Sequence, residues 1–306
     1  MDIAGAQAGL IRAPDRDAVR DMLTQALTYN SQLLRQQADR NIQSTNPYLE
    51  ADLLRLAGGW RLFLDGAGAE RAGTAYQRLR TALCRVDGWC CIDAEARRLL
   101  TGSATPSELK PWLEALRERA WRATETGLAQ REVMQILLDD ARDLQGLAAD
   151  LRGGDSSELL ALRFRSDLGK AHRRVLQALT QPELTSRDRQ ARRWLRLHDR
   201  QLELLAPLLS EASARCGWYR RRLVSLLDQL VGLRLIGSAL NDHTGFGRRL
   251  DCHRQCLVRI IDDRQRELRR RAGPLLEHGF PSTSGAAVDR EGDADAFDPV
   301  PLAVTA

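Results

Sequence analysis

Two short acidic motifs contain the side chains best suited to hold a divalent cation. The first, at residues 139–143, reads DDARD and places three carboxylates within five positions, and the second is a pair at 262–263. Mg²⁺ prefers oxygen ligands and often shares them with substrate phosphates. The candidate metal ligands are therefore Asp139, Asp140, Asp143, Asp262 and Asp263.

The DDARD motif, in a chain whose patterns predict only helices, resembles the aspartate-rich motif of class I isoprenoid synthases. The resemblance covers residues 139–143 and 262–266 alone, and the second segment, DDRQR, lacks the second aspartate of the family pattern. It implies a Mg²⁺-dependent enzyme in which facing carboxylates hold magnesium against a diphosphate. The alternative is a solvated helix face, because a buried seam through Leu137, Ala141 and Leu144 would turn the three aspartates of the first motif to water.

Four arginines and a tryptophan lie at helical spacing in the second half of the chain and are called the arginine row below. The row consists of Arg189, Arg193, Trp194, Arg196 and Arg200. Arg and Trp are enriched at protein interfaces, and a basic row beside an aromatic ring could also dock the phosphates of a nucleic acid. Acidic side chains interleave with the row at Asp188, Asp199 and Glu203, which is typical of a solvated mixed face.

The remaining reactive side chains indicate no catalytic group. Cys252 and Cys256 lie one helical turn apart and could supply two zinc ligands, although packed and unreactive cysteines give the same spacing. The five histidines are scattered, and no Ser or Cys motif for nucleophilic catalysis surrounds them. We therefore predict no catalytic residue and no bound cofactor.

The composition is that of a folded, arginine-rich protein. Of 306 residues, 43% are hydrophobic but only 5% are aromatic, so the core consists largely of Leu and Ala, which favours helices over strands. The formal net charge is +5, and Lys110 and Lys170 are the only lysines, a bias typical of GC-rich bacterial genomes. A basic surface can attract nucleic acid, anionic lipid or an acidic protein.

The sequence gives no sign of export or membrane insertion. Its first residues, MDIAGAQAGLIRAPDRD, lack the basic start and the long apolar stretch of a secretory signal. The longest apolar run, Leu223–Leu240, is interrupted by Asp228 and Arg234 and is short for a bilayer span. We therefore predict a cytoplasmic protein with no transmembrane segment and with reduced cysteines.

The spacing of apolar residues predicts an all-α protein, because no segment alternates between apolar and polar residues over a length sufficient for a β-strand. From Leu202 onward, apolar residues form two heptad series, one from Leu202 to Gly237 and one from Leu205 to Leu240. Pro207 lies inside this segment and could kink or split the helix. The predicted helices cover residues 15–43, 47–64, 68–86, 92–101, 106–152, 156–180, 186–241 and 248–273.

These helices suggest four parts along the chain: a flexible start (1–14), an N-terminal helical lobe (15–101), an elongated antiparallel bundle of long heptad-patterned helices (105–276) and a disordered acidic tail (278–306). Long heptad helices present extended surfaces to other helices, within one chain or between copies. The leading hypothesis is a non-enzymatic helical interaction protein, that is, a scaffold, adaptor or regulatory component of a bacterial assembly. It would bind protein partners or itself through the arginine row.

Two alternatives remain: a nucleic-acid-binding protein that uses the same row, and the isoprenoid-synthase-like enzyme.

Overall fold

The computed structural model describes residues 49–64, 69–86, 88–128, 139–147, 154–180, 185–205, 211–243 and 250–280, together with positions 21, 25, 28 and 32. A helical segment without a label covers residues 139–147. The labelled elements are α3 (Leu49–Leu62), α4 (Ala69–Val86), α5 (Trp89–Thr101), the 3-10 turn η1 (Ser107–Leu109), α6 (Lys110–Leu128), α8 (Gly154–Thr180), α9 (Thr185–Leu205), α10 (Glu211–Asp242) and α11 (Asp251–Gly279).

The predicted all-α class is confirmed, since every element within these ranges is a helix and none is a strand. Predicted bounds are close for α4 and α8, where the apolar period is regular. The predicted helix 106–152 corresponds to η1, α6 and the segment 139–147, with residues 129–138 outside the described part. The flexible start, nearly all of the predicted helix 15–43 and residues 281–306 of the predicted tail also lie outside it.

The predicted long helix 186–241 is two helices in the structure. α9 ends at Leu205 and α10 begins at Glu211, and the two pack against each other, so the chain reverses direction between them. Pro207 lies in the interval 206–210, which is not described. A proline inside a helix removes a backbone hydrogen bond and clashes with the preceding turn, which accounts for a break at this place.

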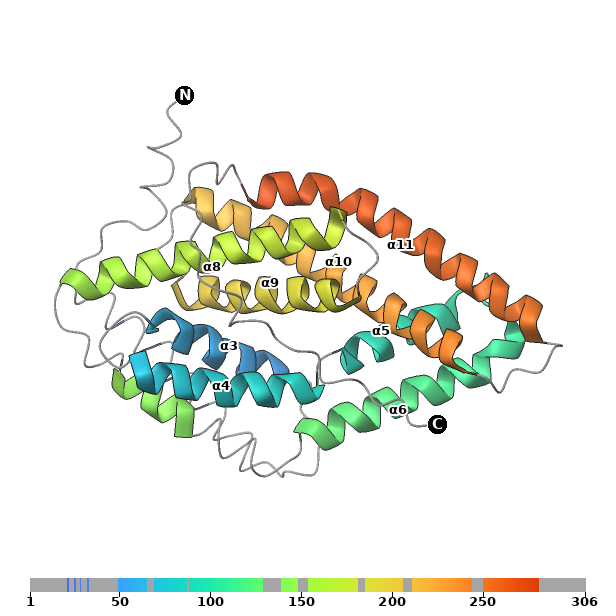
Figure 1. Ribbon diagram of the computed structural model, residues 1–306, viewed down its shortest axis with the longest axis horizontal. Coiled ribbons are helices and arrows are strands. Elements are labelled where there is room, and N and C mark those ends of the chain that lie inside the picture. The colour runs from blue at the N-terminus through green and yellow to red at the C-terminus, as the bar shows by residue number, and fades with distance from the viewer. Residues whose placement is uncertain are drawn as a thin grey trace.

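The four long C-terminal helices pack in chain order. α8 contacts α9, α9 contacts α10, and α10 contacts α11, while α11 also contacts α8. In Figure 1 the colour gradient shows successive helices running in opposite directions. Short connections favour this arrangement, because a helix joined by a few residues to the next can pack only alongside it.

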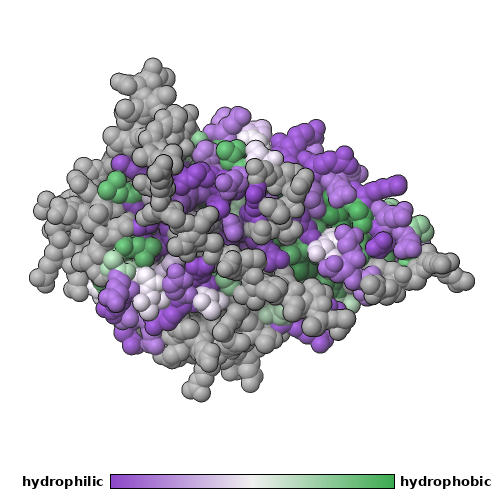
Figure 2. Space-filling model, in the orientation of Figure 1, coloured by the Kyte–Doolittle hydropathy of each residue, from purple (hydrophilic) through white to green (hydrophobic). Residues whose placement is uncertain are grey.

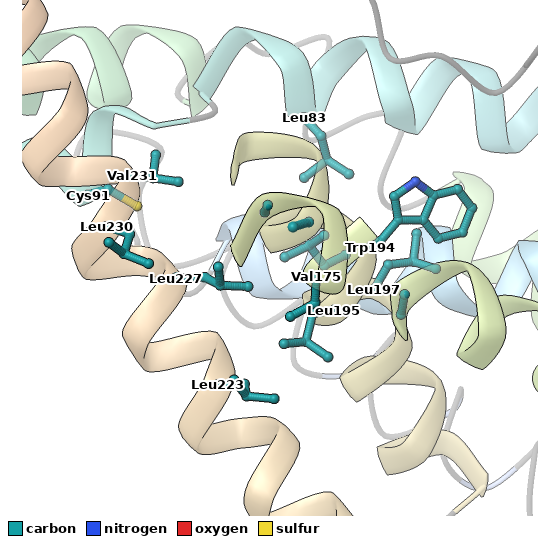
Figure 3. Close-up of a cluster of buried hydrophobic side chains, with 14 of the residues drawn as sticks. Leu83, Cys91, Val175, Trp194, Leu195, Leu197, Leu223, Leu227, Leu230 and Val231 are labelled. Carbon is teal, nitrogen blue, oxygen red and sulfur yellow. The ribbon is translucent and has the colours of Figure 1, made fainter. Parts of the chain in front are cut away.

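α10 is the central apolar helix of the molecule and contacts α5, α9 and α11. Figure 3 shows Leu223 and Leu227 projecting from α10 toward Leu195 of α9, with Val231 near Cys91 of α5. The two predicted heptad series account for only part of this burial, because Leu227 and Val231 belong to neither series and are fully buried. A helix covered by neighbours on several sides is apolar all round, whereas the heptad pattern predicted a single apolar seam.

By length and composition alone, the segment Cys216–Asp242 of α10 could also cross a membrane. In this structure 67% of its apolar window is buried inside the protein, and core helices of soluble proteins pass the same test. Among the residues that are coloured in Figure 2, most on this face are hydrophilic, with small hydrophobic areas between them. That distribution is expected when the leucines of α10 lie inside rather than on the surface.

Helices of the predicted N-terminal lobe pack directly against the long helices. α3 contacts α8 and α9, and α5 contacts α10. α5 approaches α10 closely at Gly232, where a Cβ atom would lie 2.7 Å from Cγ of Glu95. α5 itself begins after Gly88, whose φ of 90° lies in the left-handed region that favours glycine. Side chains from both predicted parts therefore form one hydrophobic core.

Candidate functional site

The arginine row lies on α9, but it is not an exposed surface. Trp194 and Arg193 are buried, at 3% and 8% exposure, and Arg189, Arg196 and Arg200 are half-buried. The exposure expected of Trp194 and Arg193 is therefore wrong, because α9 packs between α3, α8 and α10. Trp194 projects from the side of α9 that faces away from α10 (Figure 3), and the guanidinium of Arg61 stacks 4.5 Å from its ring centre.

A second arginine of α9, which the sequence pattern did not single out, is the buried centre of a partly buried ionic cluster. Arg192 Nε donates to Asp228 Oδ1 of α10 at 2.7 Å, and its Nη2 donates to Glu50 Oε1 of α3 at 3.2 Å. The same Nη2 donates to Cys90 Sγ at 3.3 Å. Arg196 completes the cluster with a 2.8 Å bond from Nη2 to Asp228 Oδ2 and a 3.2 Å ion pair to Glu50. Glu50, Cys90, Arg192, Arg196 and Asp228 are called the Arg192 cluster below.

Within the Arg192 cluster, Asp228 is ionised at neutral pH. Burial alone would raise the pKa of Asp228, but the guanidinium groups of Arg192 and Arg196 outweigh it and hold this pKa below its usual value. The pKa of Cys91, next to the cluster, is raised by its hydrogen bond with Cys90 and by burial, so Cys91 remains a thiol. The cluster thus holds two guanidinium groups against two carboxylates, with Arg192 buried and the other three side chains half-buried.

A cavity of about 350 Å³ opens beside this cluster, between α3, α5, α9 and α10. Its wall carries the carboxylates of Glu50, Glu95, Asp199 and Asp228. It also carries the guanidinium groups of Arg98, Arg196 and Arg200 and the thiols of Cys90 and Cys91. Ala94, Arg98 and Ser225 on its wall are exposed, so the cavity reaches the surface, and it is called the charged cleft below.

A separate buried network joins α3, α8 and α9. Arg61 donates to both carboxylate oxygens of Asp167, from Nε at 2.9 Å and from Nη2 at 2.7 Å. Gln201 Nε2 donates to Asp167 at 2.7 Å, and Gln201 Oε1 lies 3.2 Å from His198 Nδ1. Burial, followed by the nearby Arg220, lowers the pKa of His198 to about 3, so this imidazole is neutral. The network is enclosed and has a structural role.

The structure does not bring the two acidic motifs together. Asp139 and Asp143 are partly exposed, Asp143 pairs with Arg71 at 2.7 Å, and Asp262 and Asp263 are exposed on α11. In Figure 1 the segment 139–147 lies beside α4, on the other side of the molecule from α11. The expectation that Asp140 points to water is wrong, because it is fully buried and accepts a 2.5 Å hydrogen bond from Arg78 Nη2.

Within the described residues, no group of three or more His, Cys, Asp and Glu side chains is placed to hold a metal ion. Cys252 and Cys256, the pair with zinc-ligand spacing, are exposed on α11. Cys216, which falls on the first of the two heptad series and is therefore predicted to be buried, is half-buried. Cys90 and Cys91 lie on the wall of the charged cleft.

An aromatic patch occurs at the surface where α10 begins and α11 ends. The Trp218 patch, as it is called below, consists of Trp218, Tyr219, Arg222 and His278. Trp218 is 49% exposed, Tyr219 meets its ring edge-on at 4.9 Å, and the Arg222 guanidinium lies 5.1 Å from its centre. The sequence signal that could have found it is the aromatic pair followed by three arginines at 220–222.

No protein-family model, curated protein or solved structure matches this chain.

Proposed function

We propose that this chain is a non-enzymatic helical interaction protein, a scaffold or adaptor that binds a protein partner through the Trp218 patch. The observation that carries the proposal is the half-exposed indole of Trp218, held between Tyr219 and Arg222. Trp, Tyr and Arg are the residue types that most often dominate the binding energy of protein interfaces. An exposed indole that is already fixed by its neighbours loses little conformational entropy on binding.

The patch stands on a rigid base formed by three helices. Arg220, one residue from Tyr219, is buried, and its Nη1 donates to the carbonyl of Gly279 at 2.9 Å. Phe280 lies beneath Arg220, and its ring stacks on His172 of α8 at 4.8 Å. These contacts hold the N-terminal part of α10 against α8 and the end of α11, next to the patch.

The expected partner surface is acidic and apolar. Arg221 and Arg222 are exposed beside Trp218, so an acidic side chain on the partner would complement the rim while an apolar group covers the indole. The arginine row of α9 supports a nucleic-acid partner less well, because Arg196 and Arg200 already pair with carboxylates of this chain. A phosphate backbone would have to displace those internal partners.

The test compares two tryptophans of similar exposure. Trp218→Ser and Trp121→Ser would each be made in the full chain; Trp121 is 42% exposed on α6 and serves as the matched control. Wild-type and variant proteins, treated with nuclease, would be used to capture partners at low and high salt, with solution mass measured by light scattering. We expect a protein, or a second copy of the chain, that wild type and Trp121→Ser retain at high salt and Trp218→Ser loses.

Two results would contradict this proposal. One is an identical set of captured proteins for both tryptophan variants. The other is binding only to nucleic acid, with an affinity that falls steeply with salt, since several phosphate contacts produce that dependence and an apolar interface does not. In the second case Arg221 and Arg222, which are both exposed, would be the first residues to replace.

A further inference from the structure

Two exposed cysteines lie one helical turn apart at the start of α11, and packing in the core does not account for them. Cys252 and Cys256 are both exposed, although cysteine is among the residue types most often buried, in disulfides or out of them. The other four cysteines of the chain are buried or half-buried, as that tendency predicts. The pair on α11 therefore presents two thiols to the surroundings of the protein.

The spacing of the pair suits a metal ion better than a disulfide. Cβ atoms four residues apart on a helix are separated by about 5–6 Å, whereas the Cβ atoms of a disulfide are separated by about 3.5–4.5 Å. Two thiolates on one tetrahedral zinc ion, each about 2.3 Å from the metal, have their sulfur atoms about 3.8 Å apart, which side chains one turn apart can reach. An intact α11 thus allows both thiolates to bind one metal ion and prevents a disulfide between them.

One chain supplies only half of the ligands that such an ion needs. Structural zinc sites are almost always four-coordinate, with cysteine and histidine as the usual ligands. All six cysteines and all five histidines lie within the described ranges, and no three of the His, Cys, Asp and Glu side chains described there are placed to hold a metal ion. The residues immediately before α11, TGFGRR at 244–249, include none of these four residue types. The two missing ligands therefore come from another molecule.

We propose that two copies of this chain bind one Zn²⁺ ion between them, with Cys252 and Cys256 of each copy as its four thiolate ligands. A second copy is the partner that the ligand count favours, because a two-fold axis through the metal brings an identical pair of cysteines to the same ion. The site is separate from the Trp218 patch and does not rest on the proposed function.

The start of α11 is placed where a second copy can reach it. Figure 1 shows α11 beginning at the right-hand end of the molecule, where it contacts the turn η1. Asp251, Gln255 and Arg259, which flank the pair along α11, are exposed and polar. The large exposed hydrophobic side chains of the described residues lie on α6, α8 and α10 instead. The metal ion, rather than apolar area, would therefore hold the two copies together, and a chelator should separate them.

The experiment is light scattering of the full chain, reduced and free of metal, as Zn²⁺ is added. We expect the solution mass to double, with saturation at about one Zn²⁺ per two chains, and to return to its starting value when a chelator is added. Co²⁺ in place of Zn²⁺ reports the ligands, because its absorption spectrum distinguishes a tetrahedral thiolate site from a hydrated octahedral ion.

Five variants locate the site. Loss of a group that merely orients a metal ligand costs about tenfold or more in metal affinity, so Cys252→Ser and Cys256→Ser should each weaken zinc-dependent dimerisation by at least about tenfold. Both positions are exposed, so folding should be unaffected. Cys252→His supplies another zinc ligand at the same place and should still dimerise with zinc. Cys84→Ser, which removes a half-buried thiol of α4, and Trp218→Ser should both behave as wild type does.

A zinc-dependent dimer that both serine variants of the pair lose, and that the other three variants keep, establishes the site. The proposal is overturned if wild type binds no Zn²⁺, binds one ion per chain without a change in mass, or grows beyond a dimer without saturation. Equal dimerisation of wild type and the two serine variants also overturns it. So does a dimer that a reductant separates and a chelator does not, because that result identifies a disulfide between copies.

Discussion

The two central helices of this protein, α9 and α10, are buried by different chemistry. α10 is buried through leucines, with Leu223, Leu227 and Leu230 fully inside (Figure 3). α9 is buried together with its charges, since Arg192 and Asp188 are each 1% exposed. The difference shows that a row of charged side chains at helical spacing does not by itself mark a surface. It becomes an interior face when neighbouring helices supply partners of opposite charge.

The two kinds of interior differ in how they respond to substitution. Apolar packing is lost in proportion to the volume removed, because each methylene contributes separately. An ion pair in the interior is lost as a unit, because removal of one partner leaves the other charged and without compensation. Substitutions in the buried ion pairs and at α10 test this contrast, and the largest effect is expected where an ion pair is broken.

Replacement of Asp167 by Ala should destabilise the protein by about 3–5 kcal/mol, the cost of an uncompensated buried charge. The side chains of Asp167 and Arg61 both have zero exposure, and the two form a bidentate pair. Urea unfolding followed by circular dichroism would measure the change. The control is the double variant Arg61→Met with Asp167→Leu, which should recover most of the lost stability, since matched apolar groups can replace a buried pair. A loss below about 1 kcal/mol in the single variant would show that water reaches this pair.

On the α10 side, Gly232→Ala should destabilise by about 1–3 kcal/mol, the usual cost of overpacking. A Cβ atom at this position would meet the carbonyl oxygen of Cys91 and lie 2.7 Å from Glu95 Cγ. Backbone cannot move aside as a flexible side chain can, so α5 and α10 would have to separate. Gly73→Ala in α4 is the matched control: nothing lies within 4 Å of its Cβ, and it should stabilise by about 0.5–1 kcal/mol. Thermal unfolding of the two variants should therefore shift in opposite directions.

The all-α fold class and the positions of most helices could be predicted from the sequence, because the spacing of apolar residues depends only on neighbouring positions in the chain. Spacing and a low aromatic content predicted α4, α8 and α11, and Pro207 indicated where the longest predicted segment divides. The heptad series on α10 predicted buried positions correctly at Leu223 and Leu230. It did not predict that α5 would cover a further side of α10, since the period of one helix says nothing about how many neighbours it has.

The charged cleft could not be predicted, because its residues are far apart in the chain. Arg192 pairs with Glu50 across 142 positions and with Cys90 across 102. The arginine row included Arg196 and Arg200, which line the cleft, but it omitted Asp199, which also lines the cleft, and Arg192, which pairs with Glu50 and Asp228 of its wall. The sequence pattern groups side chains by the face of one helix. Only the packing of α3 and α10 against α9, and of α5 against α10, decides which of these side chains meet an opposite charge.

The smallest expected effect concerns Asp188, which joins the two regions. This α9 residue lies 2.7 Å from Arg234 Nε of α10 and 3.8 Å from Arg269 Nη2 of α11. Burial raises the pKa of Asp188 to about 6, and the two arginines only partly oppose it. Because this pKa lies above the ordinary 3.8, the folded protein binds a proton between about pH 6 and pH 4 that the unfolded chain does not.

The stability contributed by Asp188 therefore rises as the pH falls through 6, the reverse of Asp228, whose pKa is lowered. Relative to Asp188→Asn, which cannot titrate, wild type should gain about 1 kcal/mol between pH 7 and pH 5. Urea unfolding at several pH values measures this difference, and Asp263→Asn, exposed on α11, should leave the profile unchanged. A contrary result would be a loss of wild-type stability relative to Asp188→Asn over that interval. It would mean that the two arginines lower the pKa of Asp188 more than burial raises it, so that Asp188, like Asp228, is ionised in the folded protein.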